Sequence, residues 1–255
     1  MLSIPFFKTV LDWLEVWAIL IPLFVLLKKP QQPVYMQAVI LYLFIALFLN
    51  IVANLIWKRE TLGLNTDYNN NNPLYNLHSI FRLMFFSIFF IHLRQPFLTR
   101  IKMLIPFAFI LFVVINFIFF ENFFQKKISS RLHTVESGIL LFYCLQYYLF
   151  RLKDEQASFT KMPDFWVVTG LGIFGVISFP IYLFYDRMIY LFYGPKLDEF
   201  KFLLDIWEVQ KIGFLICCIL IAKAFYTHES YKITGDHFYC SDALVVCKFF
   251  DSIHF

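Results

Sequence analysis

The stretch from Tyr35 to Arg59 reads YMQAVILYLFIALFLNIVANLIWKR and carries no charged residue before Lys58. Its apolar part, residues 35–57, has the length of roughly 20 apolar residues that a helix needs to cross the hydrocarbon core of a bilayer. The segment closes on Trp57-Lys58-Arg59, an aromatic and basic anchor typical of a membrane–water interface. It therefore predicts a membrane-spanning helix.

The composition of the whole chain agrees with this prediction. Of its 255 residues, 60% are hydrophobic, compared with about 45–50% in an average soluble domain. The apolar residues come in long blocks separated by short polar segments. We predict an all-α fold, a polytopic transmembrane bundle in a single domain (1–226), followed by a short polar C-terminal tail (227–255). The seven predicted spans cover about 10–27, 35–57, 75–93, 102–120, 132–150, 165–186 and 202–226.

Strongly polar residues inside the predicted spans gather in one leaflet. They lie early in the odd-numbered spans and late in the even-numbered ones, and successive spans run in opposite directions. Polar groups are costly in hydrocarbon, so they mark a functional site or the interior of a bundle. The pattern predicts a polar ligand-binding pocket in the leaflet on the N-terminal side. Its candidate residues are Glu15, Asn50, Asn54, His78, Arg82, Asn116, Glu136, Asp205, Glu208 and Lys211.

Two of the charged candidates need partners. Glu208 lies three residues before Lys211, on the same face of a helix, so these side chains are expected to pair. Arg82 lies deep in its span and needs a carboxylate. The set can line a pocket for a ligand or a proton, or it can form interhelical hydrogen bonds that hold the bundle together. Three carboxylates are candidates for the partner of Arg82: Glu15, Glu136 and Asp205.

Several patterns that resemble cofactor sites do not fit their context. Residues 170–175 spell G-x-G-x-x-G, but they lie inside an apolar span with no strand before them, unlike a dinucleotide-binding loop. Gly172 and Gly175 are instead expected to let this span approach a neighbour closely. Lys223 resembles the retinal lysine of microbial rhodopsins, yet Ile219 occupies the position where that motif carries Asp. A snorkelling side chain explains Lys223 better.

Histidine and cysteine spacings give no indication of a metal site. The five cysteines form no C-x-x-C pair and the six histidines form no H-x-x-x-H pair, which are spacings typical of zinc sites. His92 and His133 are expected at the membrane interface. We therefore predict no metal, no cofactor and no enzymatic activity.

Basic residues predict an orientation. Nine fall on the side of the N-terminus and eleven on the opposite side, while Arg82 and Lys211 lie inside spans. Since cytoplasmic loops carry the excess of Lys and Arg, the N-terminus is predicted outside and the C-terminus inside. The net charge of +4 is not accompanied by a basic stripe with interleaved aromatic residues, so nucleic acid is not an expected partner.

Two segments resemble a family of seven-helix bacterial integral membrane proteins of unknown function. They are residues 71–82, NNPLYNLHSIFR, and residues 163–170, PDFWVVTG. More distantly, the chain resembles the seven-helix membrane modules of bacterial sensor proteins, without an attached kinase or cyclase. The resemblance implies a fold and a location in the bacterial inner membrane, but it does not indicate an activity.

A receptor-like or sensory role is the first functional hypothesis. The lipid bilayer, a small polar or zwitterionic ligand, and a membrane or cytoplasmic protein are the expected partners. Two alternatives stay open: a small-molecule or proton-coupled transporter, and a structural subunit of a membrane complex. Carriers usually show internal repeats, and the absence of a convincing repeat between residues 1–120 and 130–226 favours sensing.

Overall fold

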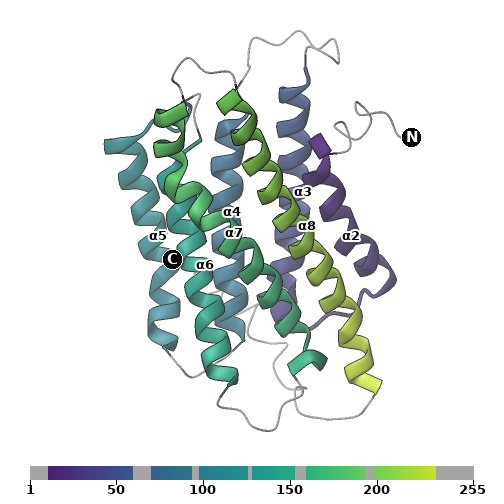
Figure 1. Cartoon of the computed structure of the whole chain (residues 1–255). Helices are drawn as coiled ribbons and strands as arrows, with labels where there is room; N and C mark the ends of the chain where they lie inside the picture. Colours follow the sequence, from purple (N-terminus) through teal and green to yellow (C-terminus); the bar gives the residue numbers. More distant parts are fainter. Residues whose placement is uncertain are drawn as a thin grey trace, which may run out of the picture.

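The computed structural model is an all-α bundle (Figure 1). It describes residues 11–59, 70–93, 98–125, 128–152, 159–192 and 198–233; the side chains of 159, 188–192, 198–206 and 228–233 are outside this description. Within these ranges the chain forms seven α-helices. They are α2 (Leu14–Lys28), α3 (Gln37–Trp57), α4 (Asn72–His92), α5 (Thr99–Ile115), α6 (Ser130–Arg151), α7 (Pro163–Phe192) and α8 (Asp198–Ile233).

Each predicted span overlaps one of these helices, and the all-α prediction is confirmed. Five helical segments are long and apolar enough to cross a membrane. α2 has 15 residues, about 22 Å at 1.5 Å per residue, which is shorter than the hydrocarbon core. α6 is less apolar because it carries His133, Glu136 and Gln146. Spanning by α2 and α6 stays a prediction. The five segments are Val34–Trp57, Asn72–His92, Thr99–Phe120, Pro163–Arg187 and Trp207–Thr227.

Several helix ends differ from the predicted ones. α4 begins before residue 75, because Pro73 stands in its first turn, where the missing N–H has no intrahelical role. α7 continues to Phe192 and α8 to Ile233, beyond the predicted ends at 186 and 226. Most of the predicted tail, residues 234–255, lies outside the described residues.

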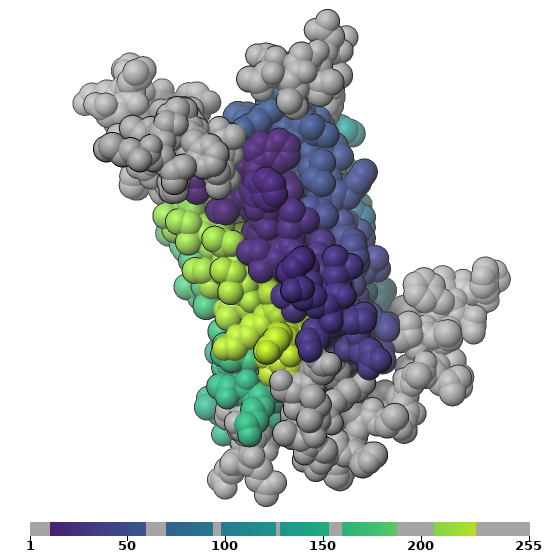
Figure 2. All heavy atoms as spheres, turned by 90° about the vertical axis from the view of Figure 1, so that its right-hand side faces the viewer, coloured from purple at the N-terminus to yellow at the C-terminus, as the bar shows by residue number. Residues whose placement is uncertain are grey.

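The helices pack so that α5 lies at the edge of the bundle. α7 contacts α6 and α8, α8 contacts α2, and α4 contacts α3, α5 and α6. Figure 2 shows α2 and α8 side by side on one face of the molecule. The edge helix α5 exposes Phe107 and Leu111, and its π-helical continuation, Asn116–Phe120, exposes Phe119. Such an apolar surface suits contact with lipid.

Glycines allow α7 to approach its neighbours. A Cβ added at Gly170 would lie 3.1 Å from the backbone O of Cys217 in α8, and one at Gly175 would lie 3.0 Å from the Leu141 side chain in α6. At Gly172 the nearest atom is 3.8 Å away, in Cys144, which is ordinary contact. The predicted close approach is therefore confirmed for Gly175 and wrong for Gly172. Gly170, which the prediction missed, meets backbone atoms.

Two alanine substitutions on the same helix test this packing. Gly170→Ala should unfold more readily than Gly172→Ala, by about 1–3 kcal/mol, because only the first pushes a methyl group into a neighbouring backbone. Both variants gain the same helix propensity, so it cancels in the comparison. Thermal unfolding of the full chain in detergent measures the difference. Equal melting temperatures would contradict the proposed α7–α8 contact.

Candidate functional site

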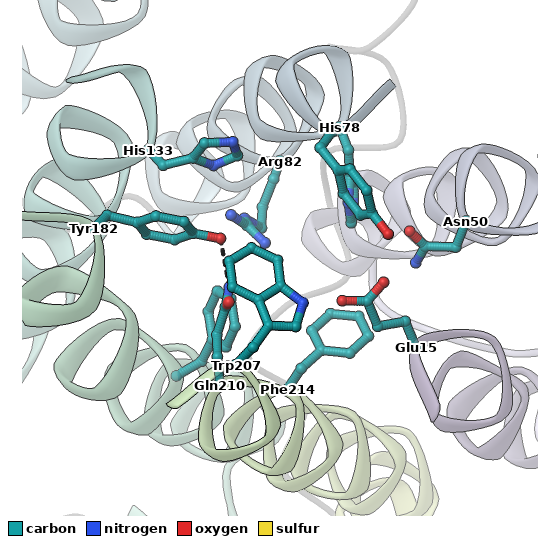
Figure 3. A pocket seen from close by; sticks show the side chains of 11 residues that line it. Glu15, Asn50, His78, Arg82, His133, Tyr182, Trp207, Gln210 and Phe214 are labelled. Carbon is teal, nitrogen blue, oxygen red and sulfur yellow. Dashed lines mark hydrogen bonds between the residues drawn. The ribbon is translucent and has the colours of Figure 1, made fainter. Parts of the chain in front are cut away.

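A polar cavity lies in the half of the bundle where α2 begins and α3 ends (Figure 3). Its volume is about 30 Å³, enough for roughly two water molecules at 10–15 Å³ each. Every described α-helix except α5 contributes to its wall. The lining residues are Glu15 of α2, Asn50 of α3, Tyr75, His78 and Arg82 of α4, His133 of α6, Phe174 and Tyr182 of α7, and Trp207, Gln210 and Phe214 of α8.

A buried ion pair between α4 and α6 borders the cavity. The Arg82 Nη2 donates to Glu136 Oε2 at 2.8 Å, and its Nε donates to Glu136 Oε1. Ser79 Oγ adds a third hydrogen bond to Oε2, at 2.5 Å. The Glu136 side chain is fully buried and that of Arg82 is 6% exposed. A bidentate arrangement of this kind satisfies both charges geometrically. The prediction that Arg82 pairs with a carboxylate is confirmed, with Glu136 as the partner.

His133 extends the pair toward α7. It lies one turn before Glu136, and its Nδ1 is 3.6 Å from Glu136 Oε2. Its ring stacks on Tyr182, with centroids 4.6 Å apart. The expectation that His133 lies at the membrane interface is therefore wrong: the i,i+3 spacing places it on the buried face that carries Glu136. His92, by contrast, is exposed at the end of α4.

His78, one turn before Arg82 on α4, and Glu15 of α2 also face the cavity. The Tyr42 hydroxyl and His78 Nε2 are 3.1 Å apart and hydrogen-bonded. Figure 3 shows the Glu15 carboxylate extending into the cavity near Asn50. Among the described residues, Glu15 has no cation within ion-pair distance. The nearby Lys211 binds Glu208 instead, at 3.0 Å.

Lys211 and Glu208 form the predicted pair, but at the edge of the site rather than inside it. Neither side chain lines the cavity. Glu208 is 35% exposed and Lys211 12% exposed. Lys211 also reaches the backbone O of Leu11 at 3.5 Å. This pair therefore joins α8 to the start of α2.

Other predicted site residues lie apart from the cavity. Asn54 Nδ2 donates to the backbone O of Asn50 at 3.0 Å, within its own helix. Asn116 Nδ2 donates to Glu121 Oε2 at 3.0 Å, beyond the end of α5. The side chain of Asp205 is outside the described part of the chain. Four of the predicted residues line the cavity: Glu15, Asn50, His78 and Arg82. A fifth, Glu136, lies behind them and is bonded to Arg82.

The prediction missed the residues that α7 and α8 contribute. Gln210 Nε2 donates to the Tyr182 hydroxyl at 2.5 Å, closing one side of the cavity. Gln210 was detectable, because it is a polar residue inside a span and next to Lys211. The aromatic wall residues were not, because the chain contains 35 Phe and 14 Tyr and most of them face lipid or pack in the core.

A second buried polar cluster lies at the other end of α6, where Arg151 and Asp164 stand just outside the predicted spans 132–150 and 165–186. Asp164 Oδ2 accepts from the Tyr147 hydroxyl at 2.9 Å and from Arg151 Nη2 at 2.8 Å. On α6, the fully packed Leu140 lies between Glu136 and this cluster. Apolar packing thus separates the second cluster from the cavity along this helix.

Comparison with known proteins gives no relative: no family model, no curated protein and no solved structure matches the chain. The five long apolar helices are compatible with an integral membrane protein. The described residues contain no group of three or more His, Cys, Asp or Glu side chains placed to hold a metal ion.

Removing Arg82 should destabilise the bundle strongly. Arg82→Ala leaves Glu136 buried without a cation, and breaking a buried pair in this way typically costs about 3–5 kcal/mol. Lys211→Ala is the matched control. Its pair is partly exposed, so a loss below about 1 kcal/mol is expected. Thermal unfolding in detergent compares the two variants, and equal stabilities would show that the Arg82–Glu136 pair does not hold the helices.

Proposed function

We propose that this chain is a receptor-like membrane protein that binds a small polar ligand in the cavity. One observation supports this best: side chains from six helices, all but α5, meet at the cavity wall. A ligand bound there would touch all six helices at once. Small shifts of packed helices are a common way to carry such a binding event across a membrane domain.

Unpartnered polar atoms at the cavity wall support a binding site rather than a purely structural role in joining the helices. Among the described residues, Asn50 Nδ2, Gln210 Oε1 and both ring nitrogens of His133 have no hydrogen-bond partner. All three side chains are buried. A buried polar atom left unsatisfied costs about 1–3 kcal/mol. Atoms away from the cavity, such as Ser87 Oγ and Ser178 Oγ, also lack partners among the described residues, so what distinguishes these four is their position at the cavity wall. Water or a ligand in the cavity would satisfy them.

The carrier alternative has less support from the geometry. A carrier needs alternating access to its site from both sides. Here the core beyond the ion pair is filled by Leu83, Phe86 and Leu140, each at most 1% exposed. The cluster around Asp164 lies past this layer, where Tyr147 and Arg151 both donate to Asp164 Oδ2. A site that communicates with one side suits a receptor better.

The segment behind the family resemblance overlaps the cavity. Residues 71–82 include Tyr75, His78 and Arg82, which line it. We therefore extend the proposal to membership of that seven-helix family, to a bacterial inner-membrane location with the N-terminus outside, and to a membrane or cytoplasmic protein that reads the occupied state.

A thermal-shift screen of the purified full chain in detergent tests ligand binding. The panel should contain small amines, carboxylates and amides. A ligand that raises the melting temperature of the wild type should fail to do so for Asn50→Leu and should still act on Asn54→Leu. These asparagines lie one turn apart and are both buried, but only Asn50 lines the cavity.

Two outcomes would contradict the proposal. If no compound stabilises the wild type, the polar residues serve only to hold the helices together, and the structural-subunit alternative is favoured. If a ligand stabilises both variants equally, it binds elsewhere on the molecule.

A further inference from the structure

We infer that the cavity selects a small protonated amine of about the size of methylammonium. This inference rests on the proposed function and adds the chemical class of the ligand. It combines the charge left without a partner at the cavity, the rings that surround it, its unpartnered acceptor and its volume.

The charge that remains available in the cavity is negative. Arg82 is committed to Glu136 through two hydrogen bonds, and Lys211 is committed to Glu208 at 3.0 Å. Glu15 alone extends a carboxylate into the cavity without an ion-pair partner among the described residues. Bringing an anion next to Glu15 would add repulsion, whereas a cation would compensate its charge.

Aromatic rings complete a site of the kind that binds ammonium groups. Trp207 and Phe214 extend toward the cavity from α8, the helix packed beside the α2 helix that carries Glu15 (Figure 3). Trp207 is held edge-on against Tyr182, with centroids 6.2 Å apart. The faces of aromatic rings attract cations, and Trp does so best. The Phe174 ring is already in contact with a cation, because the Arg82 guanidinium lies 4.7 Å from the ring centroid.

The hydrogen-bond acceptors and the volume of the cavity narrow the class of ligand further. An R–NH₃⁺ group has three N–H donors. Glu15, which is also hydrogen-bonded to Tyr75, offers carboxylate oxygens, and Gln210 Oε1 is a buried acceptor without a partner among the described residues. The cavity of about 30 Å³ corresponds to roughly two water-sized atoms. Methylammonium has two non-hydrogen atoms, and its methyl group would contact the rings. Ligands with a carboxylate as well as an amine, such as amino acids, exceed this volume.

Calorimetric titration of the detergent-purified full chain with methylammonium chloride tests the inference. Sodium chloride and sodium acetate at equal ionic strength are the comparison ligands. Saturable binding of methylammonium alone is expected, with affinity reduced at least tenfold in Glu15→Gln. The matched control is Asp12→Asn, one turn earlier. Asp12 pairs with Lys58 at 3.0 Å at the surface and does not line the cavity, so affinity should stay within twofold.

A second variant keeps the test decisive if Glu15→Gln fails to fold. Trp207→Leu retains every charge and removes the ring, and it should weaken methylammonium binding by about three- to tenfold. Unchanged affinity in both Glu15→Gln and Trp207→Leu would overturn the inference.

The outcomes separate the inference from the proposed function. If acetate or a neutral amide binds in an Asn50-dependent way and methylammonium does not, the ligand-binding function stands and the amine class is wrong. If no small molecule binds at all, both are overturned.

Discussion

A guanidinium buried in a bundle this apolar must keep its carboxylate, and the rest of the site depends on that requirement. Arg82 and Glu136 meet because α4 and α6 pack directly, and Ser79 donates a third hydrogen bond to the carboxylate. The pair fixes the relative height of two helices. Because Arg82 is bonded to Glu136, it is not available to bind a ligand. The polar groups that a ligand would meet in the cavity are therefore those of Glu15, Asn50 and Gln210.

The bundle supports this arrangement through unequal packing around it. Glycine contacts hold α7 close to α6 and α8, so that Tyr182 and Gln210 meet across the cavity at 2.5 Å. Beyond the ion pair, tightly packed Leu and Phe side chains exclude polar groups. The outcome is a small polar volume closed toward one half of the bundle. In the proposed function, this packed apolar layer beneath the polar site would let ligand binding alter helix contacts without opening a path through the bundle.

The sequence predicts much of the fold because long apolar runs leave few alternatives to helices. It also narrows the partner of Arg82 to three carboxylates, since any buried guanidinium needs one. It cannot choose among them, because that choice depends on which helices pack together. The aromatic wall escapes prediction for a different reason: in a chain with 35 Phe, ring position is decided by packing alone. His133 was placed at the interface, although its spacing of three residues puts it on the same helical face as Glu136. Asn116 was included in the pocket, although its side chain bonds Glu121 beyond the end of α5.

Whether the Arg82–Glu136 pair serves the site or only the bundle is best decided with the double variant Arg82→Met/Glu136→Met. Apolar replacement of a buried pair at similar volume is often neutral for stability. Unfolding and methylammonium titration of this variant should therefore show stability within about 1 kcal/mol of wild type, together with retained binding, because Glu15, Asn50 and Gln210 are unchanged. A double variant that is as stable as wild type but no longer binds methylammonium would contradict the account, because the pair would then belong to the binding site itself.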